Sequence, residues 1–151
     1  MPRFFATYVE KLDATYRDRP HFVGLKARLL AAFGWLLVGF VPLNIAKVIW
    51  LEPLGMSYRI GANGFMAIAA LLSLVWVHRG RPERAGGSLL LAAILPVHAL
   101  LLLMPGLAQP LSVAILVFVF DLVMLLLALV FASRLVAFGV LGIIMASQIT
   151  F

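Results

Sequence analysis

Five apolar runs separated by short polar connections dominate this sequence. They cover residues 29–51, 60–77, 88–104, 111–132 and 135–151, so each holds between 17 and 23 residues. At about 1.5 Å per residue, a helix of about 17–25 apolar residues crosses the hydrocarbon layer of a bilayer. A membrane β-strand would instead alternate apolar and polar residues over about ten positions, and none of these runs does so. The pattern predicts an all-α membrane bundle with five transmembrane helices.

Composition excludes the soluble and disordered classes of protein. Hydrophobic residues make up 64% of the 151 positions and charged residues 12%, against roughly 45–50% and ~25% in soluble domains. So few charges cannot cover so much apolar surface in water. Cysteine is absent from the sequence, which excludes disulfides and thiolate metal sites. We therefore expect an integral membrane protein.

The distribution of Lys and Arg predicts the orientation of this protein in the bilayer. Ten of the 12 cationic residues fall on one side: six before Leu29, three between the second and third runs, and Arg134. Cytoplasmic flanks carry such an excess, so the N-terminus is expected in the cytoplasm and the protein in the inner membrane. The net charge of +6 then matches anionic lipid headgroups, and we expect no nucleic-acid partner.

The segment before the first run is expected to form an amphipathic helix over residues 3–18. Phe5, Val9, Leu12 and Tyr16 share one face, and Pro20 follows as a helix terminator. Residues 1–28 thus divide into this helix and a basic linker. The helix is predicted to anchor in the cytoplasmic membrane interface. The alternative is a gating or dimer-contact helix.

The fifth run reaches Phe151 without a polar flank after it. This favours a chain that is the membrane part of a longer protein, with a sixth span completing a six-helix unit. A complete five-span protein is the alternative.

Six polar residues lie at membrane depth, and all fall in the half of the bundle away from the cytoplasm: Asn44, Lys47, Asn63, His98, Asp121 and Gln148. An ionisable side chain there costs at least ~2.5–3.5 kcal/mol and by default indicates function. Asp121 shares a heptad stripe with Ala128, which predicts that it faces the bundle interior. His98 and Asp121, on neighbouring antiparallel helices, are expected to pair.

These six residues suggest an outward-facing pocket for a small polar or anionic ligand, with His98 as a candidate pH sensor. Two alternatives remain: a structural network that neutralises Asp121, and a proton or ion path. The sequence has no catalytic motif of the protease, hydrolase or phosphate-binding-loop type, and three scattered histidines do not form a zinc site. We expect no enzymatic activity in this chain, no cofactor and no metal.

The segment YRDRP before the first run, the turn RGRPER and the short outer loops resemble the N-terminal membrane region of bacterial sensory proteins. Histidine kinases, nucleotide cyclases and chemotaxis-type transducers often begin this way. The resemblance implies a dimeric sensory domain that passes a helix shift to a cytoplasmic output domain. A small oligomeric transporter or channel subunit and a structural membrane subunit are the alternative functions.

Overall fold

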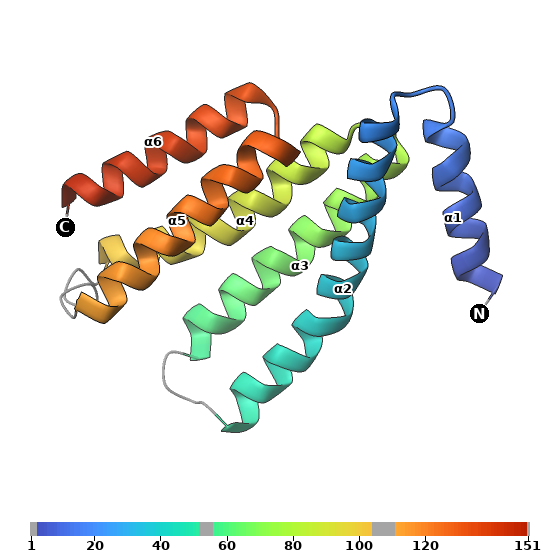
Figure 1. Ribbon diagram of the computed structural model, residues 1–151. Helices are drawn as coiled ribbons and strands as arrows, with labels where there is room; N and C mark the ends of the chain where they lie inside the picture. The colour runs from blue at the N-terminus through green and yellow to red at the C-terminus, as the bar shows by residue number, and fades with distance from the viewer. Residues whose placement is uncertain (1–2, 52–55, 104–110, 151) are drawn as a thin grey trace.

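A computed structural model describes the backbone of residues 3–51, 56–103 and 111–150. Side chains are described for residues 7–51, 56–103 and 113–147. Helices account for nearly all of this part of the chain. They follow one another as an up-and-down array with α1 at one edge and α6 at the other (Figure 1). Their bounds are α1 Arg3–Tyr16, α2 His21–Leu51, α3 Met56–His78, α4 Pro82–Leu103, α5 Leu111–Phe131 and α6 Arg134–Thr150.

Four of the helices in the described residues, α2 to α5, are long and apolar enough to cross a membrane. The expectation of an all-α, multi-pass membrane protein is therefore confirmed. Helix α6 has 17 residues and is shorter than these four. The fifth span consequently stays a prediction.

Helix α2 begins at His21, eight residues before the first apolar run. Its first turns, which the sequence suggests as a basic linker, carry a buried face because Ala27 and Leu30 join a core with Tyr16 of α1. The start of an apolar run marks where hydrocarbon begins, whereas a helix continues as long as its side chains have a surface to pack on. This difference explains the earlier start.

Helix α1 folds back against α2 and α3 (Figure 1). The Tyr8 ring stands edge-on to Trp35 at 5.6 Å and to His78 at 4.4 Å between ring centroids. The Tyr16 hydroxyl donates a hydrogen bond of 2.7 Å to the carbonyl of Val77. Burial raises the pKa of Tyr16, which keeps this donor protonated. The amphipathic face thus covers protein, and the interfacial location of α1 stays a prediction.

The α3–α4 turn is a Schellman motif, which explains why the RGRPER segment bends so sharply. Gly80 adopts a φ of 70°, and its N–H bonds to the carbonyl of Val77 at 3.0 Å, while the N–H of Arg81 bonds to the carbonyl of Trp76 at 2.9 Å. Glycine suits this left-handed position, and Pro82 then begins α4 without needing a donor. We call the end of the bundle that carries this turn and the α1–α2 turn the basic end.

Near the basic end the helices are joined by small residues. Ala27, Ala70 and Ala85 are fully buried. At Gly86, an added Cβ would overlap the backbone carbonyl of Phe131, so α4 and α5 approach each other backbone to backbone. Small residues permit such close contacts between membrane helices. Small residues thus bring the helices of this half of the bundle into close contact.

Candidate functional site

The strongest candidate site is an ionisable pair between α4 and α5. The Nε2 atom of His98 lies 3.1 Å from Oδ1 of Asp121, and the side chains of both residues are only 2% and 3% exposed. The predicted pairing of these two residues is confirmed. The heptad argument also holds, because Ala128, seven residues after Asp121, is fully buried.

The hydrogen bonds of His98 limit how protons are placed in this pair. The Nδ1 atom lies 3.0 Å from the carbonyl oxygen of Ile94, one turn back. A carbonyl only accepts, so Nδ1 carries a proton. The contact with Asp121 is then either an imidazolium facing a carboxylate, or a neutral imidazole facing a carboxylic acid. Both forms have zero net charge, which lowers the cost of burial.

A second polar contact joins α2 to α3 in the same half of the bundle. The Asn44 side-chain amide donates to Oδ1 of Asn63 at 2.8 Å. Asn63 in turn donates to the backbone carbonyl of Arg59 at 2.7 Å. This bridge is only partly buried, and it contains no ionisable group.

A third contact, between α3 and α4, involves Tyr58 and was not predicted. The Tyr58 hydroxyl donates to the carbonyl of Pro96, two residues before His98. Tyr58 and Arg59 come directly before the second apolar run. A tyrosine at such a position is usually interpreted as an anchor in the membrane interface. Pro96 did not point to this contact, because the missing N–H of a proline frees the carbonyl four residues back, that of Ala92, and not its own.

Together these contacts link four consecutive helices, one contact for each neighbouring pair. We call the set the polar belt: Asn44–Asn63, Tyr58–Pro96 and His98–Asp121. All three lie away from the basic end. The structure therefore brings four of the six predicted site residues into pairwise contacts, as two separate pairs.

The structure places the remaining two predicted residues on α2 and α6. Lys47 lies one turn beyond Asn44 on α2, and its side chain is exposed. Gln148 belongs to α6, but its side chain lies outside the described residues. Neither of two cavities found in the described structure is lined by any of the six residues. The single six-residue pocket accordingly stays a prediction.

The chemistry available in the polar belt is proton placement and hydrogen bonding. Within the described residues, His, Asp and Glu side chains form no cluster of three that could hold a metal ion. Beyond the belt, the buried polar and charged side chains among the described residues are Ser73 of α3, Lys26 of α2 and Ser147 of α6. A proton or a polar ligand that binds to a group of the belt can therefore replace a contact between two helices.

Comparisons of the chain with models of known protein families, with curated proteins and with solved structures gave no match.

Proposed function

We propose that this chain is a membrane-embedded sensory domain in which the polar belt is the responsive element. One observation carries the proposal: an ionisable pair, His98 and Asp121, holds α4 to α5 while almost completely buried. Ionisable residues within membrane helices indicate function by default, because their burial is costly. A polar ligand or a proton that changes the charge of either partner changes the free energy of the α4–α5 contact.

The arrangement of the two cores supports a helix shift as the output of this change. Helix α4 contributes to both cores: Ala85 and Leu89 pack with α1, α2 and α3, whereas Leu90 and Ile94 pack with α5 and α6. Near the basic end, Gly86 holds α4 and α5 at close approach. Weakening the His98–Asp121 contact would therefore let α5 and α6 tilt about this close contact, which is the kind of small interface shift that switches use.

The finer parts of the proposal follow from charge and from the resemblance to sensory proteins. The excess of Lys and Arg favours a cytoplasmic N-terminus in an inner membrane, which puts the basic end in the cytoplasm and the polar belt toward the outer leaflet. In this scheme α6 is the fifth span. A homodimer and a cytoplasmic output domain complete the proposal, with a small polar or anionic molecule as the ligand.

Spin labels on introduced cysteines test the helix shift, because the natural chain contains no cysteine to label. One pair, Phe40→Cys with Phe118→Cys, lies on exposed positions of α2 and α5 in the half with the polar belt. A control pair, Leu36→Cys with Leu129→Cys, lies on exposed positions nearer the basic end. In nanodiscs, Asp121→Leu is expected to move the first distance distribution by about 1–2 Å or more and to leave the second nearly unchanged. Identical distributions with and without Asp121→Leu would contradict the proposal.

Ligand binding needs a separate test. Thermal-shift measurements on the detergent-solubilised chain with amino acids, small carboxylic acids and nucleosides are expected to find a compound that stabilises the wild type. The same compound should lose its effect in His98→Leu and keep it in Lys47→Gln, because Lys47 lies outside the polar belt. Solute flux through proteoliposomes that Asp121→Leu abolishes would instead favour the transporter alternative.

A further inference from the structure

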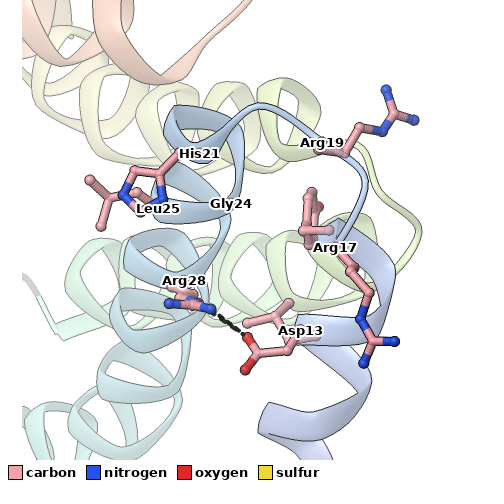
Figure 2. Close-up of a pocket in the computed structure, with 9 residues that line it drawn as sticks. Asp13, Arg17, Arg19, His21, Gly24, Leu25 and Arg28 are labelled. Atoms are coloured by element: carbon pink, nitrogen blue, oxygen red, sulfur yellow. Dashed lines mark hydrogen bonds and ion pairs between the residues drawn. The ribbon is translucent and has the colours of Figure 1, made fainter.

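A cavity of about 350 Å³ lies between α1 and α2 at the basic end, and nothing in the proposed function uses it. Arg17 and Arg19 come from the connecting turn, in the YRDRP segment, and His21 and Arg28 come from the start of α2. Figure 2 shows Arg28 reaching across to Asp13 of α1, whereas Arg17 and Arg19 extend from the turn in different directions, away from that pair. Three of the nine residues that line this cavity are arginines.

The charges around this cavity leave an excess of positive charge. Arg28 is paired with Asp13 at 2.9 Å, whereas Arg17 and Arg19 make no ion pair with any residue that the structure describes. Three arginines against one aspartate leave a net charge of +2 with His21 neutral. The cavity also opens at the first turn of α2, where the helix dipole favours an anion. These features fit a phosphate group.

An apolar groove begins one helical turn further along α2. It has a volume of about 380 Å³ and runs between α2 and α5 over α3 and α4, and all twelve residues that line it are apolar or glycine. Leu25 lines the basic cavity and Leu29 lines the groove, four positions apart on the helix. Leu29 and Phe33 are about half exposed along its edge. The two cavities therefore share helix α2, with the basic cavity on its side toward α1 and the groove on its side toward α5.

We propose that the basic cavity and the apolar groove together bind an anionic glycerophospholipid. Its phosphate lies among Arg17, Arg19 and Arg28, and an acyl chain lies in the groove between α2 and α5. The groove distinguishes this occupant from free phosphate, and the net positive charge distinguishes it from a zwitterionic lipid. Because the cavity is shared between α1 and α2, the bound lipid fastens the N-terminal helix to the bundle. This inference is independent of the sensory role of the polar belt.

Lipid binding can be measured by thermal unfolding of the full chain in a neutral detergent, followed through tryptophan fluorescence. The probes are dioleoylphosphatidylglycerol, dioleoylphosphatidylcholine and inorganic phosphate at matched ionic strength. Phosphatidylglycerol is expected to raise the melting temperature, with little effect from the other two. Arg17→Gln with Arg19→Gln removes two cationic side chains near the headgroup and should weaken the apparent affinity for phosphatidylglycerol about tenfold or more.

Two matched controls make the test specific. Arg79→Gln with Arg84→Gln removes the same charge at the same end of the bundle but outside the cavity, and should keep the phosphatidylglycerol response. In the groove, Ala93→Phe should fill the space for the acyl chain and reduce the response, whereas Leu95→Phe, on an exposed position outside the groove, should not.

Three outcomes would overturn the proposal. Equal stabilisation by inorganic phosphate would mean an anion site without a lipid. An equal loss in the Arg79 and Arg84 variant would mean general attraction between charges. A response to phosphatidylglycerol that Ala93→Phe leaves unchanged would mean that the groove does not hold an acyl chain.

Discussion

The two halves of the bundle hold the same helices together by different means. Near the basic end, alanines and glycines let the helices approach closely, and the Gly86–Phe131 contact leaves no room for a methyl group. In the other half, the polar belt supplies one hydrogen bond or ion pair for each neighbouring pair of helices. Close packing gains only from a single fitted geometry, whereas the His98–Asp121 contact depends on the protonation of its two partners. Under the proposed function, the half near the basic end stays fixed and the half with the polar belt adjusts.

Breaking the ionisable pair is expected to have the largest effect on stability. Asp121→Leu leaves His98 buried without its partner, and loss of one member of a buried pair costs about 3–5 kcal/mol. The double variant His98→Leu with Asp121→Leu replaces the pair by apolar groups and should recover most of that cost. Unfolding free energies in mixed micelles measure both variants. A double variant as unstable as the single one would show that the cost does not come from the unpaired group.

A methyl group at the close contact is expected to have the next largest effect. Gly86→Ala forces α4 and α5 apart, because the new Cβ would overlap the backbone of Phe131, and overpacking costs about 1–3 kcal/mol. Gly64→Ala is the matched control, since open space surrounds an added Cβ at Gly64. The same unfolding measurement applies. Equal effects at both glycines would contradict a fixed, close-packed half.

The fold and part of the site follow from the sequence because each rests on a local pattern. Helix count and antiparallel order follow from the length and spacing of the apolar runs. The interior position of Asp121 follows from its heptad relation to Ala128. By contrast, the Tyr58–Pro96 contact depends on how α3 and α4 are staggered, which no spacing within one helix specifies. The docking of Tyr16 on Val77, and with it the basic cavity, depends on the geometry of the α1–α2 turn.

Removing the hydroxyl that ties α1 to α3 is expected to cost about 1 kcal/mol. Tyr16→Phe deletes the donor and leaves the carbonyl of Val77 without it, while the buried ring remains. Limited proteolysis of the α1–α2 turn measures the effect, because a loosened α1 exposes the turn. Val9→Thr on an exposed position of α1 serves as the control. Equal cleavage rates in wild type and Tyr16→Phe would show that this bond does not hold α1.

The smallest effect is expected at the neutral bridge of the polar belt. Hydrogen bonds between membrane helices average about 0.6 kcal/mol, and Asn44 and Asn63 are only partly buried, so Asn44→Ala should lower the unfolding free energy by about that much. Asn63 also donates to the Arg59 carbonyl, so the effect of Asn63→Ala alone includes the loss of that bond. A double-mutant cycle with Asn44→Ala and Asn63→Ala therefore isolates the energy of the bond between the two side chains.

Comparison with the His98–Asp121 cycle then tests whether the contacts of the belt have equal energies. A coupling energy at Asn44–Asn63 as large as that at the ionisable pair would mean that the belt acts as one structural network, and the special role assigned to His98 and Asp121 would be lost.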